Sequence, residues 1–127
     1  MAEQGRDKDL DELVSDINED VRIAVVYNER DKDLDFLSED PDWYVRVAVA
    51  RIGRDCDLDD LVNDEDESVR AAVAESGRDK YLDILVHDTH PWVRQKVAYQ
   101  GREKDLEILA QDSDEYVQKV AQAIQGK

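Results

Sequence analysis

Short clusters of apolar residues at helical spacing recur along this chain. Leu34 and Leu37 form one cluster, and Leu58 and Leu61 form the next, 24 residues later. This spacing places each cluster on one face of a helix of about two turns. We therefore expect a series of brief helices, either α or 3₁₀ in type, because little room is left for them. Asp31 is expected to cap one of them with its side chain.

A longer apolar stripe follows each short cluster. In the second unit it comprises Val45, Ala48, Val49 and Ile52, the i, i+3, i+4, i+7 pattern of an amphipathic helix. A polar turn separates the two helices, and its last residue is suited to cap the second helix. The residues expected in this N-cap role are Asn18, Asp42, Asp66, His90 and Asp114.

The two patterns together repeat every 24 residues. The repeat divides the chain into units at about 5–28, 29–52, 53–76, 77–100 and 101–125. A unit this short cannot bury an apolar face alone, so the units must stack to form one continuous core. We expect a single all-α domain over residues 1–127, built as a solenoid of five two-helix repeats.

Glycine stands at the end of the longer stripe in three units, at Gly53, Gly77 and Gly101. Glycine ends a helix readily because it adopts the left-handed conformation that other residues avoid. The second unit opens with Glu29 instead, and there we expect Asn28 to take the left-handed conformation.

The longer helix resembles the second helix of HEAT-like repeats. The run Asp40–Ala50 has an aspartate, then the pair Val45-Arg46, then small apolar residues, and it is echoed at 64–74 and 88–98. The 24-residue period is similar to that of the leucine-rich repeat variant family. This resemblance spans nearly the whole chain and implies a right-handed α–α superhelix with alternating α and 3₁₀ helices. It implies no particular function, because such repeats serve many partners.

Charge and cysteine content narrow the classes of ligand. The chain has 33 acidic and 17 basic residues, a formal charge of −16. Phosphate binding depends on lysine and arginine, so we expect no direct binding to nucleic acid or membrane. The single cysteine, Cys56, cannot hold the iron–sulfur cluster that some leucine-rich repeat variant proteins carry. An unpaired thiol and the lack of a long apolar run favour a cytoplasmic protein.

Arginines at one position of the longer helix are expected to form a ladder. Each would pair with an acidic turn residue of its own or the adjacent unit, and HEAT-like proteins hold their repeats in register in this way. The alternative is a strip that binds carboxylates of an acidic peptide. The ladder residues are Arg22, Arg46, Arg70 and Arg94 with Asp16, Asp40, Asp64 and Asp88. A second set, expected to bond helix-terminal carbonyls, is Arg6, Arg30, Arg54, Arg78 and Arg102.

Aromatic residues vary between units and mark a candidate binding surface. They lie on one flank of the longer helix, outside its core stripe. Tryptophan and tyrosine are common anchors of protein interfaces, although the rings could instead seal the joints between repeats. The candidate partner-binding residues are Tyr27, Trp43, Tyr44, Trp92, Gln95, Tyr99 and Tyr116.

Candidate metal and catalytic sites are weak. Asp31, Asp33 and Asp35, like Asp7, Asp9 and Asp11, imitate the start of a calcium loop, but the required glycine and glutamate are missing. Two histidines of the group His87, Asp88 and His90 are three residues apart at a helix-to-turn junction, and we expect His90 to be a cap instead. The sequence contains no phosphate loop or nucleophile motif. We expect neither a cofactor nor enzymatic activity.

Two functions remain from the sequence. The first is a protein interaction scaffold that binds a peptide or protein, possibly a basic one, through an acidic surface bearing aromatic residues. The second is an acidic mimic of nucleic acid that inhibits a DNA-binding protein. They differ in whether aromatic or acidic substitutions weaken binding. We expect a monomer, with an end-to-end dimer as the alternative.

Overall fold

The computed structural model describes residues 9–126, and within that range the regular structure is helical, with no strand. Long and short helices alternate. The longer ones are α2 (Glu19–Val26), α4 (Trp43–Ile52), α6 (Glu67–Glu75), α8 (Pro91–Tyr99) and α10 (Glu115–Gln125). The short ones are α3 (Asp31–Leu37), α5 (Asp55–Leu61), α7 (Asp79–Leu85) and α9 (Glu103–Leu109). Residues 9–13 are also helical.

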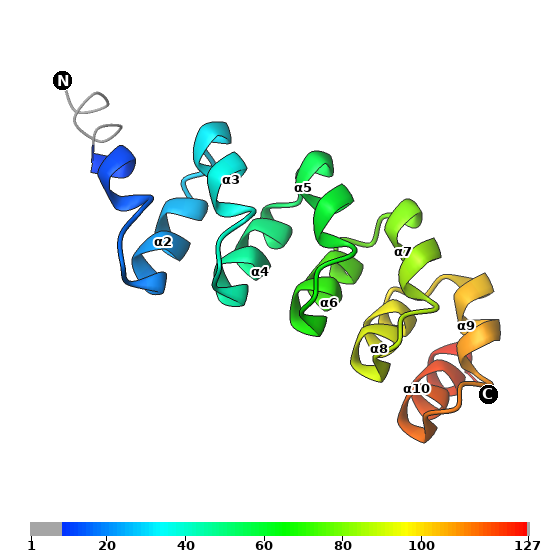
Figure 1. Cartoon of the computed structure of the whole chain (residues 1–127). Coiled ribbons are helices and arrows are strands. Elements are labelled where there is room, and N and C mark those ends of the chain that lie inside the picture. The colour runs from blue at the N-terminus through cyan, green and yellow to red at the C-terminus, as the bar shows by residue number, and fades with distance from the viewer. Residues whose placement is uncertain (1–8, 127) are drawn as a thin grey trace.

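The helices form two rows. Figure 1 shows the longer helices side by side in one row and the short helices in a second row along it. Each longer helix packs against the longer helices before and after it, and each short helix packs against its neighbours in the chain. The longer helices therefore carry the contacts between successive 24-residue segments, and the array extends from α2 to α10.

The four short helices are α-helical, so the 3₁₀ alternative is wrong for α3, α5, α7 and α9. In α3 the amide of Ser38 donates to the carbonyl of Leu34 at 2.9 Å, an i→i−4 bond. The N-cap of α3 is Arg30, which makes no side-chain capping bond. Asp31 is therefore the first helical residue and not the cap, a position where its charge still favours the helix dipole.

The longer helices begin where the sequence predicts. In each one the side chain of the N-cap residue accepts a hydrogen bond from the amide two residues later. These bonds satisfy one of the amides that a helix start leaves without a backbone partner. The observed N-caps are the five predicted ones, Asn18, Asp42, Asp66, His90 and Asp114.

The left-handed residues after the longer helices are confirmed at three positions and wrong at a fourth. Gly53, Gly77 and Gly101 have φ angles of 84°, 71° and 76°. After α2, however, the left-handed residue is Glu29 itself, with φ 58°. Asn28 instead donates its side-chain amide to the carbonyl of Ala24 at 3.0 Å. The geometry of the connection thus decides the conformation, and Glu29 adopts it although its Cβ makes it unfavourable.

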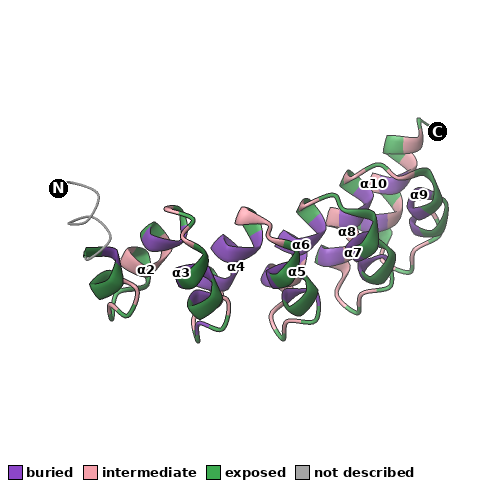
Figure 2. Cartoon of the chain, turned by 90° about the horizontal axis from the view of Figure 1, so that it is seen from above, coloured by how far each residue is buried: buried purple, intermediate pink, exposed green. Residues whose placement is uncertain are grey.

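The core lies between the two rows of helices. Figure 2 shows buried residues along the longer helices and exposed residues along the outer sides of the short ones. Leu34 and Leu37 of α3 are at most 1% exposed, as are Val45 and Val49 of α4. One face of each short helix and most of each longer helix therefore form the packed interior.

Candidate functional site

The arginine ladder joins neighbouring units through two kinds of hydrogen bond. Arg46 donates from Nε and Nη2 to the two carboxylate oxygens of Asp64, at 2.8 and 3.2 Å. Its Nη1 donates to the backbone carbonyl of Asp40 at 2.7 Å. One guanidinium thus holds the turn of its own unit and the turn of the next. The same fork pairs Arg22 with Asp40, Arg70 with Asp88 and Arg94 with Asp112.

Two details of the ladder differ from the residues chosen by sequence. Asp112 accepts the fork of Arg94 and was missed, although it follows Asp88 by one period of 24 residues. Asp16 contacts Arg22 through its backbone carbonyl, and its carboxylate accepts the amide of Asn18 instead. Each carboxylate of the ladder also accepts the amide two residues later, so it orders its own turn.

Burial and pairing act in opposite directions on the last carboxylate of the ladder. Burial by itself would raise the pKa of Asp112. The hydrogen bonds from Arg94 and from the Asp114 amide, with the positive charge of Arg94, outweigh it and hold the pKa of Asp112 below its ordinary value of 3.8. The Asp112 side chain is only 7% exposed, so this pair belongs to the packed interior.

The second arginine set does not bond helix-terminal carbonyls as predicted. Arg54 forks to the carboxylate of Asp57, with Nε to Oδ2 at 2.8 Å, and its Nη2 reaches Asp35 at 2.8 Å. Arg30 pairs in the same way with Asp33 and Asp11, and Arg102 with Asp105 and Asp83. The nearby buried aspartates outcompete carbonyls because a carboxylate accepts a bidentate fork. Arg6 lies outside the described residues, as do Asp7 and the remainder of the first turn.

One unit departs from this second ladder. Tyr81 stands where the other units have Asp33, Asp57 and Asp105, and it is 1% exposed. Its hydroxyl donates to Asp59 Oδ1 at 2.8 Å. Burial, followed by that hydrogen bond, raises the pKa of Tyr81. Arg78 is left more exposed than its counterparts and pairs with Asp55.

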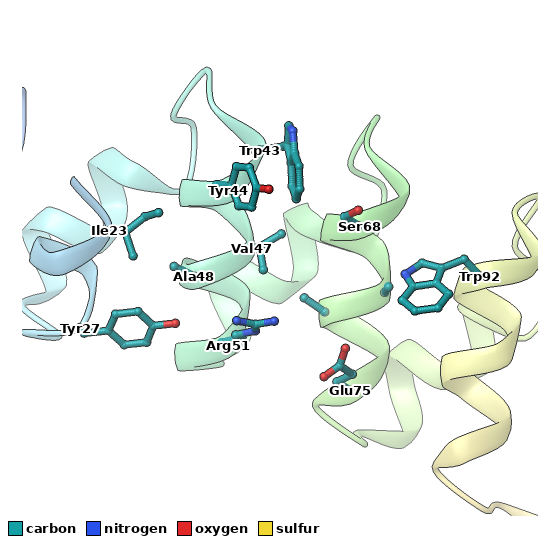
Figure 3. A pocket seen from close by; sticks show the side chains of 12 residues that line it. Ile23, Tyr27, Trp43, Tyr44, Val47, Ala48, Arg51, Ser68, Glu75 and Trp92 are labelled. Carbon is teal, nitrogen blue, oxygen red and sulfur yellow. The ribbon is translucent and has the colours of Figure 1, made fainter. Parts of the chain in front are cut away.

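Four of the predicted aromatic residues line one pocket. Tyr27 of α2, Trp43 and Tyr44 of α4, and Trp92 of α8 surround a depression of about 290 Å³. Its floor includes the small residues Ser68, Ala71 and Ala72 of α6. Figure 3 shows Trp43 and Trp92 on opposite sides of α6. The narrow side chains of α6 leave this space open between two longer helices with large side chains.

The aromatic walls are held by local contacts. The rings of Trp43 and Tyr44 stack with centroids 3.8 Å apart. On the other wall, Nζ of Lys96 lies 4.4 Å from the centre of the Trp92 ring, within the range of a cation–π contact. The same Nζ is 3.9 Å from Glu75. Both walls are therefore ordered before any ligand arrives.

The other three predicted residues lie beyond the pocket on the same row of helices. Gln95 donates its side-chain amide to the hydroxyl of Tyr99 at 3.2 Å. A hydrogen bond between Tyr99 and Tyr116 raises the pKa of Tyr116. These contacts connect α8 to α10. The exposed fractions of Tyr27, Tyr44, Trp92, Tyr99 and Tyr116 are 42% to 59%, so these rings are only half used by packing within the chain.

Sequence reasoning missed two charged members of the pocket. Arg51 and Glu75 lie at the end of the pocket away from Trp43, as Figure 3 shows. Both occupy the helix position of Tyr27 and Tyr99, one period apart. The frame of the repeat would have found them, because it places them on the same flank as the aromatic residues.

The acidic groups do not assemble into a metal site within residues 9–126. Asp33 is buried against Arg30, and Asp35 pairs with Arg54. His90 is a cap, as predicted, because its Nδ1 accepts the amide of Trp92 at 3.1 Å. His87 is exposed.

Comparisons with known proteins add no family to this description. The chain matches no protein-family model and no curated protein. In the part of the chain that the structure describes, no helix is both long and apolar enough to cross a membrane.

Proposed function

We propose that this protein is a non-enzymatic scaffold that binds a peptide or protein partner on the row of longer helices. In this proposal the chain is a right-handed solenoid of five repeats, acts as a cytoplasmic monomer, and binds through the pocket between α4 and α8 with its extension toward α10. The rings of Trp and Tyr supply large contact areas at small entropic cost.

The observation that carries this proposal is where the units differ from one another. Core and ladder positions repeat almost without change. Variation is concentrated at four positions of the longer helix, which share one flank because they are spaced i, i+3, i+4 and i+7. We call these positions the variable face. Its members are Asp20, Ile23, Ala24, Tyr27, Tyr44, Val47, Ala48, Arg51, Ser68, Ala71, Ala72, Glu75, Trp92, Gln95, Lys96, Tyr99, Tyr116, Lys119, Val120 and Ala123.

This pattern favours binding over simple sealing of joints. A ring that only sealed a joint would be useful at every joint, as the valines and ladder arginines are. The variable face instead has large rings on α4 and α8 and small residues on α6 between them. The proposal also explains why Tyr44 and Tyr116 remain more than half exposed.

The acidic mimic has less support, because regularly spaced carboxylates of the short helices are paired. Asp35 bonds Arg54, Asp59 bonds Lys80, and Asp83 bonds both Arg102 and Lys104. A nucleic-acid mimic must present unneutralised charge at regular spacing to a basic partner. The aromatic pocket, by contrast, is lined by one positive and one negative side chain, Arg51 and Glu75.

The test is affinity capture from lysate with the native chain and with a Trp92→Ala, Tyr99→Ala variant, read by mass spectrometry. We expect partners of the native chain to be lost from the variant, whose circular dichroism should be unchanged because both rings are half exposed. Phe36→Ala is the matched control, since Phe36 is an exposed ring on the short-helix row.

Each outcome separates the alternatives. Loss of the same partners from the Phe36 variant would indicate nonspecific capture by exposed rings and would contradict the scaffold. Partners that survive the double substitution and are released by moderate salt would favour the acidic mimic. Unfolding of the double variant would assign the rings to joint packing.

A further inference from the structure

Arg51 is distinguished by the ion pair that it lacks. Within residues 9–126, every lysine and every other arginine forms an ion pair with a carboxylate, whereas Arg51 forms none. The chain has nearly twice as many acidic as basic residues. A cation without a carboxylate is therefore unusual here, and it stands in the aromatic pocket.

The fold gives no structural reason for arginine at this position. The equivalent residues of the other longer helices are Tyr27, Glu75, Tyr99 and Ala123. A positive charge in the last turn of α4 is favourable to the helix dipole. Glu75, however, occupies the same place in α6, so the dipole does not select the residue. Arg51 also donates no side-chain hydrogen bond within the described chain, and its planar fork of donors is left available.

The surroundings of Arg51 define what would bind it. The aromatic walls and the floor of Ala71 and Ala72 accept apolar groups, and the pocket volume of about 290 Å³ is near the lower limit of sites that hold small molecules. Glu75 is already approached by Lys96. The pocket thus offers a small apolar space with one unmatched guanidinium at its edge.

We propose that the pocket binds a segment of a protein partner in which a bulky apolar side chain lies next to a carboxylate. The apolar side chain enters between Tyr44 and Trp92, and the carboxylate accepts a bidentate fork from Arg51. This inference rests on the proposed scaffold function and specifies the chemistry of its partner.

The charge of the whole chain limits how this contact acts. A charge of −16 slows the approach of an acidic segment, but at physiological salt its reach is about 8 Å. The pair with Arg51 is made only at contact. Arg51 should therefore lengthen the lifetime of the complex and leave the association rate nearly unchanged.

The test selects a phage-displayed library of random dodecapeptides against the wild-type chain. We expect the enriched peptides to share an aromatic or large aliphatic residue beside Asp or Glu. Fluorescence anisotropy then compares one enriched peptide on four proteins, the wild type, Arg51→Gln, Arg51→Lys and Arg78→Gln. Arg51→Gln should raise Kd by about tenfold or more, with a smaller rise for Arg51→Lys, which keeps the charge and loses the fork.

Arg78→Gln is the matched control, because it removes the same charge from an arginine outside the aromatic pocket. It should leave Kd unchanged, and an equal loss in both variants would reduce the effect to net charge and overturn the inference. Replacing the peptide carboxylate by its amide should cost as much as Arg51→Gln, and the two changes together should cost no more than either.

The remaining outcomes distinguish the inference from the function on which it rests. Enriched peptides that lack a carboxylate, ignore Arg51→Gln and lose affinity with Trp92→Ala would overturn the inference and leave the scaffold standing. A library that yields no binder sensitive to Trp92→Ala would overturn both.

Discussion

The ladder aspartates combine three roles in one side chain. Asp112 receives the guanidinium of Arg94, accepts the amide of Asp114, and is almost buried. A buried charge is tolerated only when its partner and hydrogen bonds are complete. The cost of disturbing such a residue therefore comes mainly from the partner that it leaves behind.

We expect Asp112→Asn to lower the free energy of unfolding by about 3 kcal/mol at pH 7, because Arg94 would keep its charge and lose its carboxylate. Urea unfolding followed by circular dichroism measures this change. Asp31→Asn is the control: the Asp31 side chain is 87% exposed, and its replacement should alter stability by no more than about 0.5 kcal/mol. Equal losses in the two variants would contradict the interior role of Asp112.

The same pair predicts how stability depends on pH. The pKa of Asp112 lies below its ordinary value of 3.8 in the folded chain, so the unfolded chain takes up this proton first as pH falls. The contribution of the pair is complete above pH 3.8 and is lost as pH falls through the folded pKa. The difference in unfolding free energy between wild type and Asp112→Asn should therefore shrink on acidification below 3.8. A constant difference would exclude this linkage.

At the scale of elements, the connections between helices are under more strain than the helices themselves. Four connections use glycine at positive φ, counting Gly126 after α10, and one uses Glu29 at φ 58°. A side chain with a Cβ atom pays about 1 kcal/mol or more in this conformation, whereas glycine does not.

Glu29→Gly should consequently raise the free energy of unfolding by roughly 0.5 kcal/mol, the strain relieved being partly offset by the greater freedom of glycine in the unfolded chain. Gly101→Ala is the reciprocal control. It should destabilise the chain by about 1 kcal/mol, since a Cβ there meets no atom within 4 Å and only the backbone opposes it. Thermal unfolding of both variants measures the two signs, and destabilisation by Glu29→Gly would show that its side chain has a contact role.

Periodicity was sufficient to predict the helices, because the apolar residues of each helix follow its own period. It predicted the five N-caps and the partners of Arg22, Arg46 and Arg70 from residue type and the 24-residue frame. It could not predict that Arg54 would choose Asp57 over a backbone carbonyl, since both lie within reach along the chain. The pocket was also beyond it: Arg51, Ala72 and Trp92 come from three helices, and only packing places them together.

At the scale of the whole molecule, stability should vary along the array. A longer helix in the middle, such as α6, packs against a longer helix on each side, whereas α10 packs against only one within the described chain. Opening an end breaks fewer contacts than opening the middle.

Native-state hydrogen exchange should therefore be slowest in α6 and faster toward α2 and α10. We expect protection factors in α6 to exceed those of α2 by roughly tenfold or more. Mass spectrometry of peptic fragments provides the measurement, with exchange in urea as the control for intrinsic rates. Uniform protection from α2 to α10 would mean that the array opens as one cooperative unit.

The direction of the ladder has an evolutionary consequence. Every ladder arginine reaches forward to the aspartate 18 residues later and back to the turn of its own unit. A duplication or deletion of one 24-residue segment, by recombination within the gene, would therefore leave each remaining arginine with an aspartate in front of it. The array could change length in one genetic step without a compensating substitution, and each added segment would bring four new residues to the variable face for selection to act upon.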